Sequence, residues 1–227
     1  MNTPEKLSNK VGQVGHRVDF KKLLISDCEK LEILPETVGQ LECLKDLEIR
    51  GCPNLKVLPD SIGQLEKLTC LRIVGCKKLE TLPEALESLR NLWIWDCPNL
   101  TSLPMSLGKL KFLEELKTTG CAKFKLLPDS LGQLKYLKDL YIVGCEKLET
   151  LPETLGKLES LRKLEIKNCP NLTSLPMSLG KLKCLFSLII GCVNLKALPE
   201  DVGTLETLRM LMIMGCEKLE ALPESLG

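Results

Sequence analysis

The chain has 227 residues, of which 31 are basic and 30 acidic, and its formal net charge is +1. Because the charges nearly cancel, the chain has no overall electrostatic field to attract a polyanion. Aromatic residues make up only 4% of the chain and offer few rings on which bases could stack, so we expect no nucleic-acid partner. No stretch has the length and apolar character of a membrane span or a signal peptide, which predicts a soluble, cytoplasmic protein without a membrane partner.

The first nineteen residues lie outside any regular pattern and include His16, the one histidine of the chain. We expect residues 1–19 to form an irregular leader or partial cap. The remaining residues, 20–227, are predicted to form a single repeat domain.

The repeat is defined by nine Leu-Pro pairs, each with a cysteine seven residues before the proline, at steps close to 24 residues. The cysteines are Cys28, Cys52, Cys76, Cys97, Cys121, Cys145, Cys169, Cys192 and Cys216. A fixed period of this length predicts a solenoid, in which each unit buries its apolar face only by stacking on its neighbours. We count about nine repeats, the last one truncated at Gly227.

Each unit begins with the pattern L-x-x-L-x-I-x-x-C, whose period of two predicts a short strand with one buried face. Glycine, aspartate or asparagine precedes the repeat cysteine of every unit, Gly191 included, and predicts a left-handed turn that ends the strand. We expect the cysteine to enter the core as a reduced, small packing group.

The second half of each unit forms the return to the next strand. Proline suits the first position of a helical turn, and the glycine four residues later suits its end. In the one unit that is three residues short, Glu87 replaces this glycine, so we expect a tighter return there.

Parallel strands lie about 4.8 Å apart, whereas helical returns need more room, so the stack must curve with its strands inside. The predicted fold is therefore an α/β solenoid. It is a horseshoe with a concave parallel β-sheet of about nine short strands, and its convex returns are loops, 3-10 turns or short helices.

The pattern from Leu161 to Cys169, continued through Leu175-Pro176, resembles a leucine-rich repeat over residues 20–227. Cysteine replaces the commoner asparagine, and two residues separate it from the next leucine. In this it is similar to repeats of plant intracellular nucleotide-binding leucine-rich-repeat disease-resistance proteins. The resemblance implies the ligand-sensing and autoinhibitory domain of an immune receptor in plant defence, with the nucleotide-binding module elsewhere.

Two alternatives stay open. Residues 97–111 and 169–183 are identical over 15 positions, which fits either a recent duplication or an engineered consensus scaffold without a natural ligand. Both segments carry an N-glycosylation motif, at Asn99 and Asn171, which we attribute to one inherited accident. The chain also suits the substrate-binding repeat domain of a larger enzyme such as a ubiquitin ligase.

Motifs for catalysis, cofactors and metals are missing from the sequence. There is no phosphate-binding loop, no H-E-x-x-H and no C-x-x-C pair, and a single histidine does not build a triad across repeats. The acidic residues recur at repeated surface positions, as solvated charge does. We predict no enzyme activity, no cofactor, no metal site and a protein ligand as the partner.

Side chains of a strand alternate, so positions three, five and seven of each unit, counted from the first strand leucine, should form exposed rows on the concave face. Trp93 and Trp95 lie two residues apart on one strand, among aromatic and arginine residues of the type enriched in binding hot spots. The predicted protein-binding surface comprises Glu48, Arg50, Arg72, Val74, Trp93, Trp95, Lys117, Tyr141, Val143, Glu165 and Lys167. The alternative is that the two indoles only pack on each other and on long neighbouring side chains.

Two further expectations concern single positions. Cys70, at position three, should be exposed. Met210, Met212 and Met214, with Ile189 beside them, fit either an adaptable interface or a surface that faces missing repeats. An open end there predicts a monomer or a truncation-driven end-to-end dimer.

Overall fold

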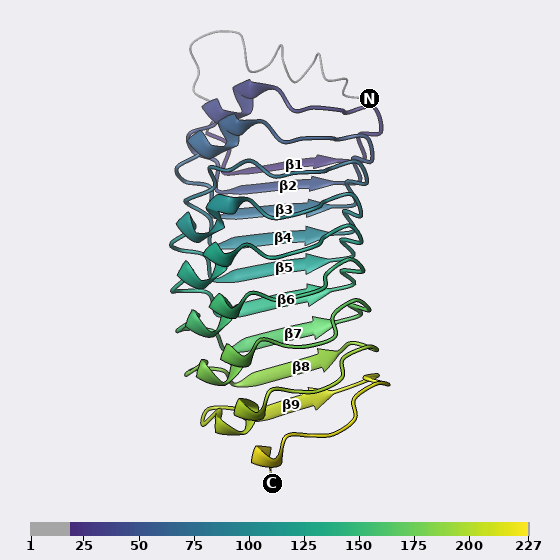
Figure 1. The fold of residues 1–227 in the computed structure, drawn as a ribbon. Coiled ribbons are helices and arrows are strands. Elements are labelled where there is room, and N and C mark those ends of the chain that lie inside the picture. Colours follow the sequence, from purple (N-terminus) through teal and green to yellow (C-terminus); the bar gives the residue numbers. More distant parts are fainter. Residues whose placement is uncertain (1–18, 227) are drawn as a thin grey trace.

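The computed structural model describes residues 19–226, so the predicted leader at residues 1–19 lies almost wholly outside the described part. Within residues 19–226, nine parallel strands form one sheet in chain order (Figure 1). The strands are β1 (Lys22–Ser26), β2 (Asp46–Arg50), β3 (Cys70–Val74), β4 (Asn91–Trp95), β5 (Glu115–Thr119), β6 (Asp139–Val143), β7 (Lys163–Lys167), β8 (Ser187–Gly191) and β9 (Met210–Ile213). The 3-10 helices are η1 (Glu36–Gln40), η2 (Asp60–Gln64), η3 (Met105–Lys109), η4 (Asp129–Gln133), η5 (Glu153–Lys157), η6 (Met177–Lys181), η7 (Glu200–Thr204) and η8 (Glu224–Leu226).

The strand register follows the repeat. Leu47 pairs with Leu71, and Leu71 pairs with Leu92 across the short unit. The inward leucines therefore stack in a column, and those of β2 to β8 are fully buried, each contributing about 1.5–3 kcal/mol of hydrophobic stabilisation. Repetition of one register along the chain gives one continuous core.

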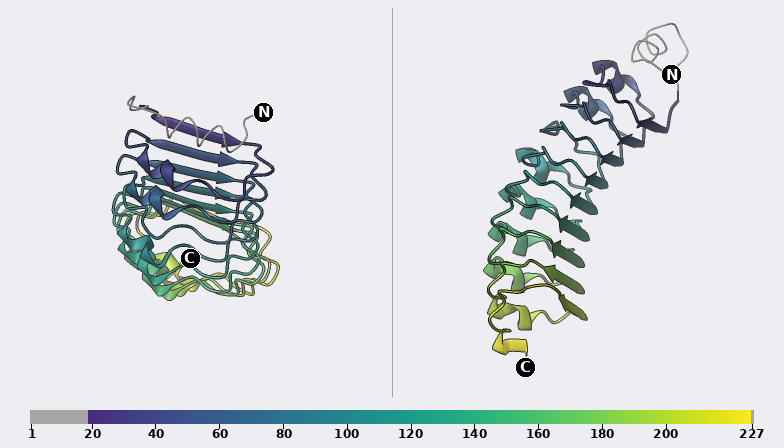
Figure 2. Two further views of the ribbon diagram at one scale, coloured as in Figure 1. Left: turned by 90° about the horizontal axis from the view of Figure 1, so that it is seen from above. Right: turned by 90° about the vertical axis from the view of Figure 1, so that its right-hand side faces the viewer.

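The stack curves as predicted. The side view in Figure 2 shows the strands along the inner side of the arc and the 3-10 helices along the outer side. The predicted horseshoe is confirmed, and its concave surface is the sheet.

The cysteines form a row inside this core. Cys52 to Cys192 of the row are buried, Cys28 and Cys216 at its two ends are half-buried, and all are free thiols. Eight of the nine lie near the carbonyl oxygen two residues earlier, as Cys169 Sγ does at 3.3 Å from the Lys167 oxygen, whereas Cys192 contacts the Ile166 oxygen of the preceding coil. Burial raises the pKa of the Cys52 thiol to about 11 and that of Cys121 to about 12. The predicted row of reduced packing thiols is confirmed.

The turn before the cysteine is left-handed in eight of the nine units, with φ from 53° at Asp96 to 68° at Gly75. Gly191 was predicted to turn in the same way, and this is wrong. It is the last residue of β8 and pairs with Lys167, in the seventh strand position. The unit has lost its turn residue, and the strand has kept its full length.

The returns differ from the prediction in two details. Proline precedes the 3-10 helix and is extended, with ψ 149° at Pro128, so it does not occupy the first helical position. The glycine lies within the helix and is required by the neighbouring coil: a Cβ on Gly132 would lie 2.6 Å from the carbonyl oxygen of Thr154. Successive coils thus approach one another closely wherever this glycine occurs.

The short unit between β3 and β4 has turns and bends where the other units have a 3-10 helix. Its Ser88 hydroxyl donates to the carbonyl oxygens of Leu65 and Leu68, at 3.1 and 2.8 Å. The expected tighter return is confirmed.

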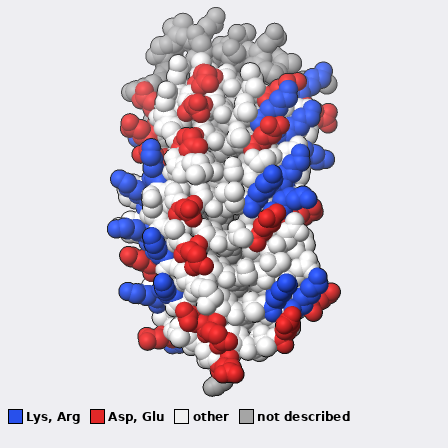
Figure 3. Space-filling view, in the orientation of Figure 1, with Lys and Arg blue, Asp and Glu red and all other residues white. Residues whose placement is uncertain are grey.

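The convex face carries a column of acidic side chains over the 3-10 helices (Figure 3). Some of them join coils: the Glu153 carboxylate accepts hydrogen bonds from the backbone N–H groups of Ser178 (3.0 Å) and Met177 (3.1 Å). These bonds hold the pKa of Glu153 below its usual range. Part of the convex charge is therefore structural.

Candidate functional site on the concave sheet

The central feature of the concave face is an alternation of cations and aromatic rings along position five of the strands. Register places Arg72, Trp93, Lys117 and Tyr141 side by side on β3 to β6. The Arg72 guanidinium lies 4.5 Å from the centre of the Trp93 ring, and Lys117 Nζ lies 4.8 Å from the same ring. Lys117 also lies 4.5 Å from the Tyr141 ring, whose other cation is Lys163 at 4.9 Å. Each such contact contributes about 0.5–1 kcal/mol at an exposed site.

Acidic residues at position three hold these cations in place. Asp46 pairs with Arg72 at 2.9 Å, and Glu115 pairs with Lys117 at 2.7 Å. Glu115 also accepts a 2.8 Å hydrogen bond from the indole N–H of Trp93. The sequence analysis did not single out these two acids. The available signal was that position three belongs to the same exposed face as position five.

Asp139 on β6 is another acidic residue at position three, and it also lies among charged neighbours. Partial burial raises its pKa, and the nearby negative charge of Glu115 raises it further, against the opposing effect of Lys163. A protonatable carboxyl group therefore lies beside the cation–aromatic alternation.

The two indoles contact each other. Their ring centres are 5.7 Å apart with an angle of 26° between the planes. Both side chains are half-buried on the concave side of β4. Trp95 extends the aromatic surface from position five into position seven, where Val74 and Thr119 are its register neighbours.

The structure places all eleven predicted site residues on the concave sheet. Those at the margins are Glu48 and Arg50 on β2, and Glu165 and Lys167 on β7. Glu165 binds two lysines, Lys167 at 2.9 Å and Lys163 at 3.7 Å. That this surface binds a protein stays a prediction.

Three positions in the rows predicted to be exposed are buried: Cys70, Ser187 and Ile189. Cys70 is buried because the thiol contacts Asp46, which pairs with Arg72 beside it, and burial raises its pKa to about 12. Ile189 is also buried, since it lies between the longer side chains of Glu165 on β7 and Met212 on β9. Met210, Met212 and Met214 are exposed, so the exposed apolar group at this end of the sheet consists of these three methionines and does not include Ile189.

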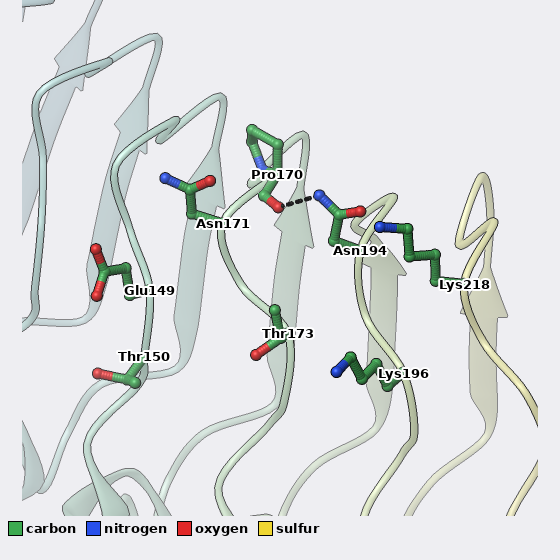
Figure 4. A pocket seen from close by; sticks show the side chains of 8 residues that line it. All are labelled: Glu149, Thr150, Pro170, Asn171, Thr173, Asn194, Lys196 and Lys218. Carbon is green, nitrogen blue, oxygen red and sulfur yellow. Dashed lines mark hydrogen bonds between the residues drawn. The ribbon is translucent and has the colours of Figure 1, made fainter.

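A hollow lies beside the sheet, in the turns that follow the strands (Figure 4). It has a volume of about 590 Å³ and is lined by Glu149, Thr150, Pro170, Asn171, Thr173, Asn194, Lys196 and Lys218. Asn194 uses its amide to donate to the Pro170 carbonyl oxygen at 2.7 Å, a link between coils. Asn171 and Thr173 of one glycosylation motif are exposed here.

In the described residues, no group of three His, Cys, Asp or Glu side chains could hold a metal ion. None of the helices in residues 19–226 has the length and apolar character needed to cross a membrane.

The family described as "Leucine-rich repeat region" matches residues 3–100 of the chain. Among solved structures, the leucine-rich repeat domain of the type III effector XopL has a TM-score of 0.69 and 25% identity, covering 91% of this chain and 79% of that one. The leucine-rich-repeat protein LIC12759 of Leptospira interrogans has a TM-score of 0.67 and 25% identity, covering 97% of this chain and 60% of that one. Toll, from the Drosophila Toll–Spatzle complex, has a TM-score of 0.69 and 21% identity, covering 99% of this chain and 30% of that one. No curated protein sequence matches.

Repeat, register and structural neighbours together define a leucine-rich-repeat domain. The chain spans well over half of the effector domain but only a minor part of the Toll chain. None of these three proteins is named as a plant receptor, so the likeness to plant disease-resistance proteins stays a prediction.

Proposed function

We propose that this leucine-rich-repeat domain is a recognition module that binds a protein partner on its concave sheet. The observation that carries the proposal is the connected cluster of Arg72, Trp93, Trp95, Lys117 and Tyr141. Tryptophan, tyrosine and arginine dominate binding hot spots. Because ion pairs and ring contacts already hold these side chains, a partner would cost them little conformational entropy.

The competing explanation is that the indoles only pack on one another. Trp95 favours binding over this explanation. Trp93 has an acceptor for its indole N–H in Glu115, whereas in residues 19–226 the indole N–H of Trp95 has none. This N–H is open to solvent, so it is free to donate to an acceptor that a partner supplies.

In its finer form, the proposal is that the domain senses ligand and restrains activation in a plant-type cytoplasmic immune receptor. Its support is the cysteine in each repeat where asparagine is commoner. A second candidate is the substrate-binding domain of a larger protein, and similarity to an effector domain over 91% of the chain favours it. The flanking sequence distinguishes the two candidates. A phosphate-loop module beside the repeats would indicate the receptor, and a catalytic domain beside them would indicate the enzyme.

The test compares two double variants for capture of partners from plant extract. Trp93→Ala with Trp95→Ala removes the concave aromatic pair. Phe112→Ala with Tyr136→Ala is the matched control, because these two rings are exposed outside the strands. Captured proteins are identified by mass spectrometry and rebound in purified form, with circular dichroism to verify folding.

We expect the tryptophan variant to lose a partner that the control variant retains. Retention of every partner by the folded tryptophan variant would overturn the proposal that the concave sheet is the binding surface.

A further inference from the structure

The last residues of β2 to β7 form a strip with apolar side chains in the middle and a cation at each end. In register order the strip comprises Arg50, Val74, Trp95, Thr119, Val143 and Lys167. Arg50 is exposed, and the other five are half-buried. An apolar, partly accessible centre between two cations is a pattern that a complementary segment could match.

The backbone of this strip is already engaged. The turn N–H of Gly75 donates to the Trp95 carbonyl oxygen at 2.8 Å, and that of Gly120 donates to the Val143 oxygen at 2.8 Å. A ligand therefore cannot join the sheet here as an added strand. Recognition must rely on the side chains.

In the part of the chain that the structure describes, the cations at the two ends of the strip have no acid of their own. In the described residues Arg50 has no ion-pair partner. Lys167 has no acid of its own, because it shares the carboxylate of Glu165 with Lys163, which also lies near Asp139. The cations of position five differ, because Arg72 and Lys117 each have an acid of their own.

The middle of the strip disfavours an anion. Asp96, the exposed turn residue after Trp95, places a negative charge at its rim where the strip has no cation. Asp27, the equivalent turn residue of β1, lies beside the cation Arg50. Like charges across an interface suppress the wrong partner, whereas opposite charges select the right one. The strip therefore favours acids at its ends and apolar groups between them.

Length sets the size of the ligand. From β2 to β7 there are five strand steps of about 4.8 Å, or about 24 Å, which an extended chain covers with about seven residues. We infer that the strip binds an extended segment of a protein partner, with apolar side chains flanked by acidic residues about seven positions apart. This inference rests on the proposed function and adds the chemistry of the partner.

The test is selection from a displayed library of random twelve-residue peptides, performed on the wild-type domain and on Arg50→Ala with Lys167→Ala. A matched control, Lys77→Ala with Lys218→Ala, removes two exposed lysines outside the strip. Selected peptides are then synthesised with a fluorophore, and their affinities are measured by anisotropy at low and high salt. Analytical ultracentrifugation is run on the same proteins.

We expect wild type and control to select peptides with two acids six to eight positions apart around apolar residues. Exchanging both acids for lysine should weaken binding at least about tenfold, and added salt should weaken the original peptide. The Arg50/Lys167 variant should lose the acidic preference and bind the selected peptides about threefold to tenfold more weakly.

Other outcomes overturn the inference in distinguishable ways. Two results would refute the preference for acidic ends: selected peptides without paired acids, or equal binding of the peptides by the Arg50/Lys167 variant. Concave binding would still stand in either case if Trp93→Ala with Trp95→Ala abolishes peptide binding. Recovery of no binders, with dimerisation that the Arg50/Lys167 variant loses, would make a second copy the occupant. The proposed function itself fails only if the tryptophan variant keeps its natural partner.

Discussion

The indole N–H of Trp93 on β4 donates a 2.8 Å hydrogen bond to the carboxylate of Glu115 on β5. The same carboxylate pairs at 2.7 Å with Lys117, whose ammonium group lies 4.8 Å from the Trp93 ring. One acid thus fixes both a ring and the cation above it. The concave surface is organised before any partner binds.

Replacing Glu115 with alanine should release Trp93. The ring loses its acceptor and Lys117 its partner, so we expect tryptophan emission to shift to longer wavelength and iodide quenching to increase. The assay is specific because the chain has only two tryptophans, Trp93 and its stacked neighbour Trp95. The free energy of unfolding should change by no more than about 1 kcal/mol, since the exposed pairs contribute little.

Glu48→Ala is the matched control, because Glu48 is a half-buried acid on the same face, two strands from Trp93. Its emission spectrum should equal that of wild type. A Glu115 variant with an unchanged spectrum and unchanged quenching would show that the carboxylate does not position the ring.

Gly132→Ala should weaken the contact between successive coils. Its new methyl group would meet the Thr154 carbonyl oxygen at 2.6 Å, so the coils must separate. Gly75→Asn tests the other kind of glycine, which has φ +68° and no neighbour nearer than 3.7 Å. Asn168 already adopts this turn at φ 53°, so Gly75→Asn should be tolerated.

Urea denaturation followed by circular dichroism measures both changes. We expect Gly132→Ala to lower the midpoint more than Gly75→Asn, with a loss of about 1–3 kcal/mol for the former. The reverse order would mean that turn conformation, and not coil spacing, limits stability.

Periodicity alone was sufficient to predict the fold and the position of most concave residues. Leucines one repeat apart, such as Leu47 and Leu71, are register partners because each unit can bury its leucine only against the equivalent leucine of the next unit. The row of buried thiols and the shared orientation of Trp93 and Trp95 follow from the same alignment.

Local errors arose where composition did not decide between two structures. Glycine fits both a left-handed turn and a strand end. The unit of Gly191 is one residue shorter than most, so the prediction assigned Gly191 to the turn although it ends the strand. Cys70 is buried because the side chain of its neighbour Asp46 contacts the thiol, and the position of a residue within the repeat does not predict such a contact. The role of Glu115 depended on contacts between strands that only coordinates show.

Alkylation should distinguish three kinds of cysteine. Cys184 is exposed, Cys43, Cys28 and Cys216 are half-buried, and the other eight thiols are buried. With iodoacetamide at neutral pH, we expect rapid modification of Cys184, slower modification of the half-buried group and protection of the buried eight. In concentrated guanidinium all twelve cysteines of the chain should react.

Peptide mapping by mass spectrometry identifies the modified sites. Rapid modification of Cys121 or Cys145 in the native protein would contradict the buried row. So would twelve unreactive cysteines after denaturation without reductant, since that result would require disulfides.

The buried thiols should also make the domain sensitive to alkaline pH. Burial raises the pKa of Cys121 from 9.0 to about 12 in the folded state, so above pH 9 the unfolded chain loses a proton that the folded chain keeps. The stabilising contribution of this thiol is therefore complete below pH 9 and declines as the pH rises toward 12. The decline approaches about 1.4 kcal/mol per pH unit for each such thiol.

Cys121→Ser removes the ionisable group, whereas Cys184→Ser removes an exposed thiol and serves as the control. Between pH 8 and pH 10.5, the urea midpoint should fall less in Cys121→Ser than in wild type, and by an equal amount in Cys184→Ser. Parallel declines in all three proteins would show that ionisation of Cys121 does not contribute to alkaline unfolding.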